Sequence, residues 1–193
     1  IQMCSSGWMT WNQAQTGMTG TIIIPEVKTT STTLATSTEI ISGTTRTWLA
    51  ERGLLKAEDV LNIARPDSGP YLVSTTAIAI ENSHNFGGGT VQPINEIKKL
   101  RQETQKLGIS MHLDGARIWN AHVATGVDFK EYGKYFDTLS VCLSKGLGAP
   151  IGSLMISSKE RITKARQWRK RYGGGMRQVG LIAAAGHYAL DNN

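Results

Sequence analysis

The fold is decided by three short apolar runs, Ala77-Ile78-Ala79-Ile80, Ile109-Ser110-Met111-His112-Leu113 and Leu139-Ser140-Val141-Cys142-Leu143. Each has the length and composition of a buried β-strand, and each is followed by polar residues. Between the first two runs, Pro93 opens a stretch with apolar residues at helical spacing, and Gly108 supplies a stop signal. The pattern therefore predicts a βαβ unit with two parallel strands.

The same alternation continues toward the end of the sequence. We expect a strand at Ser153-Leu154-Met155-Ile156, a helix from Lys159 to about Tyr172, and a last helix from Val179 to Leu190. Short strands that alternate with amphipathic helices are typical of an α/β fold with a mainly parallel sheet. Because ligands of open α/β sheets bind beyond the carboxyl ends of the strands, the polar ends of the three apolar runs are expected to converge on one pocket.

Residues 1 to 52 have a different character from the rest. They include the polar tract Thr29-Thr30-Ser31-Thr32-Thr33 and show little periodicity beyond Ile22-Ile23-Ile24. Such segments bury too little apolar surface to offset the entropy of ordering, so we expect weak order there. The sequence is accordingly divided into this atypical segment and one folded part, residues 53–193.

Composition narrows the class of protein. A length of 193 residues suits one domain, and the net charge of +6 is spread over interleaved acidic and basic residues rather than one nucleic-acid surface. Cys4 and Cys142 are far apart, which favours a reduced, cytoplasmic protein. No apolar stretch reaches the roughly 20 residues of a membrane span, and no secretory signal is visible, so no membrane partner is expected.

Lys145 is the first candidate for chemistry, in the run Leu143-Ser144-Lys145-Gly146-Leu147-Gly148. A lysine that attacks a carbonyl carbon must lose its ammonium proton, which burial or nearby positive charge favours. The two glycines permit a sharp turn and leave space for a flat ring. The alternative is a lysine at a strand end whose amine simply reaches solvent.

Asp114 and Arg117 follow the second apolar run. A carboxylate such as Asp114 can keep the ring nitrogen of pyridoxal 5'-phosphate protonated, which the electron-sink chemistry of that cofactor requires. The alternative is that Asp114 caps the helix expected near Ala116. Arg117 offers a fork of donors that suits the carboxylate of an amino acid, and the alternative there is an ordinary ion pair.

One stretch, Lys164 to Tyr172, is densely basic and carries interleaved aromatic residues, a pattern that also occurs in RNA-binding proteins. It runs into Gly173-Gly174-Gly175-Met176-Arg177, where small residues could free backbone amides for an anion and Arg177 adds a full charge. A cofactor phosphate explains these glycines better than nucleic acid, so no nucleic-acid partner is expected. His84 could bind a substrate hydroxyl or move its proton, or be a structural histidine.

Four motifs together, in this order and at this spacing, resemble the low-specificity L-threonine aldolases, which belong to the aromatic amino acid β-eliminating lyase/threonine aldolase family. The resemblance covers about Gly53 to Asn193. The motifs are Glu81-Asn82-Ser83-His84-Asn85, His112-Leu113-Asp114-Gly115-Ala116-Arg117-Ile118-Trp119-Asn120, Cys142-Leu143-Ser144-Lys145-Gly146-Leu147-Gly148-Ala149-Pro150 and Gly173-Gly174-Gly175-Met176-Arg177-Gln178.

The resemblance implies the fold-type I PLP-dependent transferase-like large domain, a mainly parallel sheet with helices on both faces. It also implies a homodimeric or homotetrameric lyase that uses pyridoxal 5'-phosphate, and no metal, to cleave L-threonine or L-allo-threonine to glycine and acetaldehyde. By resemblance, Lys145 is the Schiff-base lysine, Asp114 holds the pyridine nitrogen, Arg117 the substrate carboxylate, Arg177 the cofactor phosphate, and His84 contacts the substrate.

The sequence also departs from these relatives, which are longer at both ends. They carry an upstream Ser-Gly-Thr phosphate loop and a histidine stacked on the cofactor, and a downstream small domain with a further arginine. Ser42-Gly43-Thr44 resembles that loop but lies too close to Asp114, and no histidine precedes His84. We therefore interpret residues 1–52 as foreign to the family and the chain as a fragment without the small domain.

Three functional hypotheses stay open on this basis. The first is retro-aldol cleavage of threonine. The second is another reaction of the same cofactor on an amino acid, such as β-elimination or racemisation, since the cofactor machinery is shared. The third is an inactive fragment.

Overall fold

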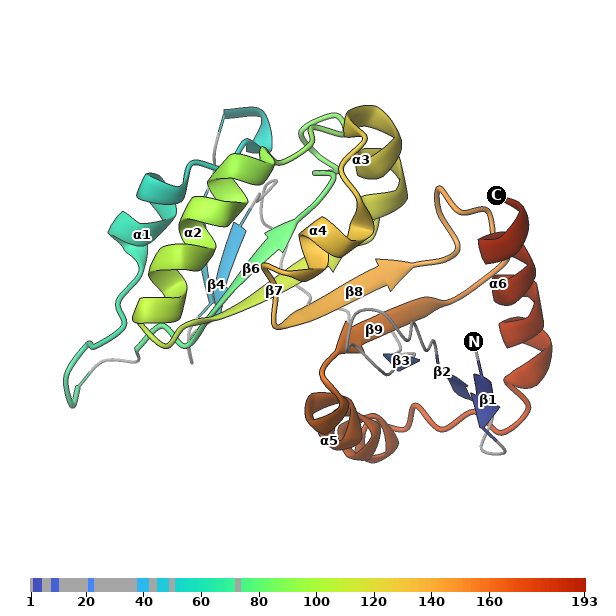
Figure 1. Cartoon of the computed structure of the whole chain (residues 1–193). Coiled ribbons are helices and arrows are strands. Elements are labelled where there is room, and N and C mark those ends of the chain that lie inside the picture. Colours follow the sequence, from blue (N-terminus) through green and yellow to red (C-terminus); the bar gives the residue numbers. More distant parts are fainter. Residues whose placement is uncertain are drawn as a thin grey trace. The chain divides into compact units, whose positions relative to one another are not determined.

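In the computed structural model, residues 51–71 and 74–193 are described, together with the backbone of five short strands before residue 49. The chain forms two compact units (Figure 1). We call Ser31–Asp137 the crossover unit, and Ile1–Thr30 with Thr138–Asn193 the lysine unit. Ser42-Gly43-Thr44 and most of the segment 1–52 lie outside the described residues, so the predicted character of that segment stays a prediction.

The crossover unit is built on four strands in the order β5-β4-β6-β7. The parallel pair predicted from the sequence is confirmed, because β6 and β7 are parallel in a register that places Glu81 opposite Asp114. Strand β4 runs antiparallel to both β5 and β6. The bounds are β4 (Thr38–Ile41), β5 (Thr45–Trp48), β6 (Ala77–Glu81) and β7 (Ser110–Gly115).

Helix α2 (Ile94–Lys106) is the crossover between β6 and β7, as the sequence predicts. It begins after Pro93, whose fixed φ suits a helix start, and it ends before Gly108, whose φ of 67° favours glycine. Leu107 continues the helical spacing of apolar residues in the sequence, and it is 45% exposed. The reason is that the helix has already ended there, and Leu107 is its C-cap.

The core of the crossover unit lies between α2 and the strand pair β6–β7 (Figure 1). Strand β6 is buried at three consecutive positions, which means that both of its faces are covered. Helix α1 (Ala57–Ile63) packs beside α2, and the short helices α3 (Ile118–Thr125) and α4 (Phe129–Gly133) follow β7. The most deeply buried side chains are Leu55, Val60, Ile78, Ile80, Ile97, Leu100, Met111, Leu113 and Tyr132.

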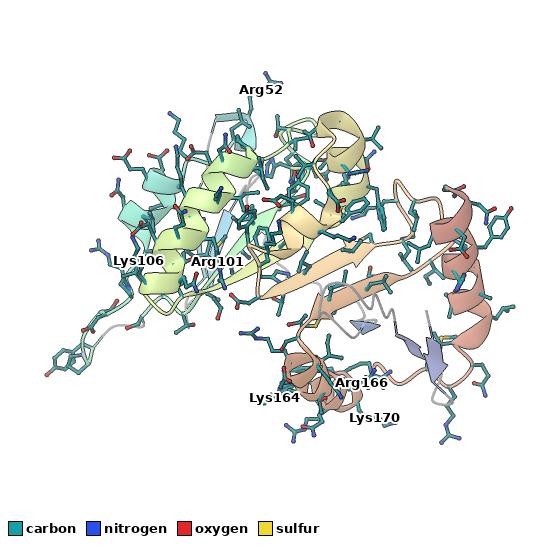
Figure 2. All side chains as sticks on the ribbon, in the orientation of Figure 1. Arg52, Arg101, Lys106, Lys164, Arg166 and Lys170 are labelled. Carbon is teal, nitrogen blue, oxygen red and sulfur yellow. The ribbon has the colours of Figure 1, made fainter. Side chains whose placement is uncertain are left out.

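Asp137 ties α2 to strand β7. Its Oδ2 accepts hydrogen bonds from Arg101 Nη1 at 2.7 Å and from the backbone N–H of Met111 at 2.9 Å. Arg101, on α2 (Figure 2), also approaches Oδ1 at 3.4 Å with Nη2. Only 21% of the Arg101 side chain and 15% of the Asp137 side chain are exposed, so solvent screens this pair weakly.

Asp137→Ala is expected to lower the free energy of unfolding by about 1–3 kcal/mol, because the buried N–H of Met111 loses its acceptor. Chemical denaturation followed by circular dichroism measures this. The matched control is Glu103→Gln, which removes an exposed ion pair with Lys106 (2.7 Å). The control is expected to cost less than about 0.5 kcal/mol. Equal losses in the two variants would show that Asp137 contributes no more than a surface charge.

The lysine unit contains the antiparallel strands β8 (Thr138–Cys142) and β9 (Ser153–Ser157), and β3 (Thr21–Ile22) pairs antiparallel with β9. Strands β1 (Gln2–Cys4) and β2 (Trp8–Thr10) form a separate ladder. Helix α5 (Lys159–Arg171) packs against β9, and α6 (Gly180–Asn192) follows it. Both helices confirm the predicted ones. No helix among the described residues has the length and apolar character needed to cross a bilayer.

The strands of the two units, each taken by itself, pair mainly antiparallel, whereas the sequence predicts a mainly parallel sheet. Among the strand pairs described with their register, β6–β7 is parallel and β3–β9, β4–β5, β4–β6 and β8–β9 are antiparallel. Parallel strands need a crossover of a dozen or so residues, usually a helix. The link from Cys142 to Ser153 holds no helix, so β8 and β9 pair antiparallel. The predicted α/β class is confirmed.

Candidate functional site

Two of the three predicted polar strand ends meet at the carboxyl edge of β6 and β7. Glu81 and Asp114 are opposite each other in the parallel register. Asn82 donates its backbone N–H to the carbonyl oxygen of Asp114 at 2.9 Å. The edge, which we call the β6–β7 edge, therefore brings together the side chains of Glu81, Asp114 and Arg117.

Asp114 keeps one carboxylate oxygen available at this edge. Its Oδ1 accepts a hydrogen bond from the backbone N–H of Ala116 at 3.0 Å, and its side chain is exposed. Helix α3 begins later, at Ile118, with Arg117 in the N-cap position. Asp114 therefore closes a local turn and does not cap α3, which removes the capping alternative. Within the described part of the chain, its Oδ2 makes no hydrogen bond.

Arg117 forms an ion pair with Glu81. Its Nη1 lies 3.7 Å from Glu81 Oε1, with 28% of the arginine side chain and 22% of the glutamate side chain exposed. The distance is too long for a hydrogen bond, so within the part of the chain that the structure describes the guanidinium donors stay available to a ligand. The sequence motif contains Glu81, but no role was predicted for it. What marks Glu81 as part of the site is the strand register, because β6 ends at Glu81 directly opposite Asp114 of β7.

Burial raises the pKa of Glu81 above its ordinary value of 4.5. The hydrogen bond from the backbone N–H of Asn85, at 3.1 Å to Oε1, lowers it, as do His84 and Arg117. Asp114, directly across the strand pair, raises it further. The net direction of the pKa shift is upward, so ionising this carboxylate costs more in the folded chain than in the unfolded chain.

The raised pKa of Glu81 predicts a pH dependence of stability. A carboxyl group with a raised pKa gives stability that is fully present below its unfolded pKa and is lost as pH rises through its folded pKa. Glu81→Gln is therefore expected to gain in thermal midpoint relative to the unsubstituted chain between about pH 4 and about pH 7. A difference that is independent of pH would contradict this.

Glu96→Gln is the matched control with the opposite sign. The hydrogen bond from Lys99 and that from the N–H of Ala57 lower the pKa of Glu96. The stability contributed by Glu96 is therefore present above its unfolded pKa and is lost as pH falls through its folded pKa. This variant is expected to lose in thermal midpoint relative to the unsubstituted chain over the same rise in pH.

His84 is enclosed and does not line the exposed part of the edge. It is 1% exposed, its Nδ1 accepts a hydrogen bond from the N–H of Gly87 at 2.9 Å, and its Nε2 lies 3.5 Å from Glu81 Oε2. A Cβ on Gly53 would come within 2.2 Å of Nδ1, so the ring is packed tightly. The enclosed ring faces Glu81, and the expectation that His84 contacts the substrate stays a prediction.

Asn82 supplies a buried donor without an acceptor. Its side chain is 0% exposed, and its Oδ1 accepts a hydrogen bond from the N–H of Gln92 at 3.2 Å. Its Nδ2 has no hydrogen-bond partner in the described part of the chain. An unmet buried donor costs about 1–3 kcal/mol. A ligand acceptor that reached this nitrogen would recover that cost, and the sequence pattern gave no sign of it.

Lys145 lies in the lysine unit, just after β8. Its carbonyl oxygen accepts a hydrogen bond from the N–H of Gly148 at 2.9 Å, and Gly148 has a φ of 78°. This is the sharp turn that the glycines predict, and it leaves the Lys145 side chain exposed. The predicted approach of Lys145 to the β6–β7 edge stays a prediction.

The glycine run after α5 ends the helix and is not an open anion site. The N–H of Gly173 donates to Lys170 O at 3.2 Å, and the N–H of Gly174 donates to Arg169 O at 2.9 Å. With Gly173 at a φ of 81°, this is a Schellman cap. The expectation that these glycines free their amides is therefore wrong, because the helix carbonyls use them. Arg177 lies beyond the cap with an exposed side chain.

The basic stretch lies on α5, where Lys164 and Lys170 are exposed and Arg166 is partly buried (Figure 2). Its aromatic residues contact one another. The rings of Trp168 and Tyr172 stack with centroids 5.8 Å apart, and the guanidinium of Arg171 lies 4.9 Å from the Trp168 ring. These contacts within one helix suit a solvated helix face.

On α5, Arg169 lies close enough to Arg166 for its own positive charge to be disfavoured. Burial lowers the pKa of Arg169, and the neighbouring Arg166 lowers it further. Each is partly buried. The local electrostatics of α5 are thus dominated by positive charge, as the sequence predicts.

Known proteins share this sequence over most of its length. The family model described as beta-eliminating lyase matches residues 16–193. The chain belongs to this family. The match starts inside the segment 1–52, whose separation as a domain stays a prediction.

Relatives in the family confirm the resemblance to low-specificity L-threonine aldolases. The chain is 45% identical over 141 residues to the "Low-specificity L-threonine aldolase" of Candida albicans, covering 72% of this chain and 37% of that protein. It is 44% identical over 144 residues to the "Low specificity L-threonine aldolase" of Escherichia coli K12, covering 75% and 42%. The chain thus spans about two fifths of the length of these relatives.

Solved structures support the fold. Threonine aldolase from Leishmania major matches with a TM-score of 0.67 and 20% identity, covering 76% of this chain and 43% of that one. A putative L-allo-threonine aldolase from Listeria monocytogenes matches with a TM-score of 0.64 and 24% identity, covering 72% and 36%. The predicted fold class is that of these family members.

Proposed function

We propose that this chain is part of a lyase that uses pyridoxal 5'-phosphate to cleave L-threonine or L-allo-threonine to glycine and acetaldehyde. The observation that carries the proposal is the β6–β7 edge. It sets a carboxylate with an available oxygen, Asp114, beside an arginine whose donors are available, Arg117. Several reactions of this cofactor could use such an edge. The sequence identity to threonine aldolases favours threonine cleavage among them.

The residues of the edge fit the cofactor by their chemistry. Asp114 Oδ2 can accept a hydrogen bond from a protonated ring nitrogen, and Asn82, just after the neighbouring strand, offers a buried donor in its unmet Nδ2. Bound in this way, the cofactor would supply an electron sink for the pair released from the breaking Cα–Cβ bond. Asp114 and Asn82 come from adjacent strand ends, which fixes their spacing.

The remaining roles belong to three cationic side chains. Lys145 would hold the cofactor through its amine and move a proton at the substrate Cα. Arg177 would bind the cofactor phosphate with its exposed guanidinium, and Arg117 would bind the substrate carboxylate. Over the whole reaction, the substrate hydroxyl loses its proton to become the aldehyde oxygen, and Cα gains a proton to become glycine.

The test is to express the chain, add pyridoxal 5'-phosphate, and measure visible absorption and glycine release from L-threonine and L-allo-threonine. Bound cofactor with release of glycine and acetaldehyde in equal amounts supports the proposal. Bound cofactor without glycine release contradicts the reaction. Failure to bind the cofactor means that this chain is inactive by itself, as the third hypothesis from the sequence holds.

A second candidate is β-elimination, favoured by the description of the matching family as beta-eliminating lyase. From threonine, elimination yields ammonia and a 2-oxo acid, whereas retro-aldol cleavage yields glycine and an aldehyde. Product analysis by chromatography therefore separates the two reactions. Racemisation would change only the chirality of the amino acid.

We propose a cytoplasmic protein that assembles with copies of itself, in line with the resemblance to threonine aldolases. Its partner is a small amino acid, and neither nucleic acid nor membrane is proposed as a partner. Light scattering at several protein concentrations tests for a dimer or tetramer.

A further inference from the structure

We propose that Glu81 is a positioning residue, which holds the guanidinium of Arg117 at the β6–β7 edge in the orientation that receives a substrate carboxylate. This inference rests on the proposed function, because it assigns to Arg117 the carboxylate of an amino acid. It adds a residue to which no role has been assigned, and it explains why a glutamate ends strand β6.

The first support is the set of contacts around the Glu81 carboxylate. Oε1 accepts a hydrogen bond from the N–H of Asn85 at 3.1 Å and lies 3.7 Å from Arg117 Nη1. Oε2 lies 3.5 Å from His84 Nε2. Each oxygen thus has a polar neighbour from the protein, and among the described residues the carboxylate forms an ion pair with one arginine, Arg117.

The second support is the state of His84. Because Nδ1 accepts the hydrogen bond from the N–H of Gly87, the ring proton of neutral His84 is on Nε2, which faces Glu81. The ring itself is 1% exposed and enclosed by Gly53 and Gly87, so it cannot swing away. An enclosed ring therefore gives Glu81 Oε2 a fixed polar neighbour at 3.5 Å, while Glu81 Oε1 faces Arg117.

The third support is the charge pattern of the edge. Glu81 and Asp114 are opposite each other, so their negative charges repel. The positive charge of Arg117 offsets part of this repulsion. Burial raises the pKa of Glu81, so its negative charge is held at this edge at a cost whenever the group is ionised. A residue retained at a cost in stability is often retained for function. A single ion pair at 3.7 Å leaves the arginine fork restrained but not saturated.

The experiment compares Glu81→Gln with the unsubstituted chain by two measurements. The first is the NMR signal of the Arg117 guanidinium without cofactor, which is assigned by its absence in Arg117→Ala. Rotation of the guanidinium is expected to be restricted in the unsubstituted chain and fast in Glu81→Gln. The second is kinetics with L-threonine, where KM is expected to rise about tenfold while kcat changes less, the sign of lost ground-state binding. Threoninamide, which lacks the carboxylate, is expected to show no such rise.

Two further variants keep the test decisive. Glu81→Asp retains the charge on a shorter side chain and is expected to show a smaller release of Arg117, and it replaces Glu81→Gln if that variant does not fold. In the Arg117→Ala background, Glu81→Gln is expected to have no further effect on KM. Glu103→Gln, which breaks an exposed pair with Lys106, is the control and is expected to change neither measurement.

The outcomes separate this inference from the proposed function. An Arg117 signal that is the same in Glu81→Gln, or an equal rise in KM for threonine and threoninamide, overturns the inference. An unsubstituted chain that binds cofactor but acts on no amino acid overturns the proposed function instead. In that case the Arg117 signal still decides whether Glu81 orients Arg117.

Discussion

Lys145→Ala is expected to abolish the visible absorption of bound pyridoxal 5'-phosphate and the release of glycine from threonine. The amine is the only group of this side chain that can bond to the cofactor aldehyde, and alanine has none. Loss of its proton transfer alone predicts a fall of about 10²–10⁴-fold in rate. Absorption spectra after dialysis, together with glycine measurement, test both parts.

Lys159→Ala is the matched control for this prediction. Lys159 also has an exposed side chain in the lysine unit, at the start of α5. Its loss is expected to leave both readouts unchanged. If Lys145→Ala retains the absorption, or if Lys159→Ala loses it equally, the cofactor is attached elsewhere and the assignment of Lys145 is wrong.

Local signals in the sequence were sufficient to predict the βαβ unit. Pro93 and Gly108 bound α2 correctly because each acts on its own backbone, through a fixed φ and a positive φ. Leu107 shows the limit of periodicity, because the apolar spacing continues to a residue where the backbone has already ended the helix. The direction of β9 depends on the link between β8 and β9, which holds no helix. The periodicity of apolar residues does not encode that direction.

The site was predictable where the chemistry lies at a strand end, and not where it depends on partners far away in sequence. Asp114 and Arg117 follow one strand and could be singled out. Glu81 gains its role from the register with another strand, and the enclosure of His84 depends on Gly53, remote in sequence. Neither relation can be read from residue order.

The glycine run shows a different limit. Gly173 was expected to open an anion site, and it forms a helix cap instead. Both structures need a residue that tolerates positive φ, so the composition is the same. Only the partners of the N–H groups distinguish them. The proposed phosphate contact therefore depends on Arg177 more than on the glycine backbone.

Asp114→Asn is expected to lower the rate of glycine release by about 10²–10³-fold, the range seen when one preorganised electrostatic partner of a reacting group is removed. Asparagine keeps an oxygen that can accept the 3.0 Å hydrogen bond from Ala116, so the turn and the thermal midpoint are expected to stay nearly unchanged. What it loses is the negative charge toward the ring nitrogen.

Asp128→Asn supplies the matched control, because Asp128 Oδ1 accepts the same kind of local hydrogen bond, from the N–H of Lys130 at 2.7 Å. It sits at the N-cap of α4, outside the β6–β7 edge, and its loss of charge is expected to leave the rate unchanged. If the two asparagine variants release glycine equally fast, Asp114 is a turn residue like Asp128. If Asp114→Asn alone is slow at an unchanged thermal midpoint, its charge serves the reaction and not the fold, which is the distinction that the available Oδ2 of Asp114 predicts.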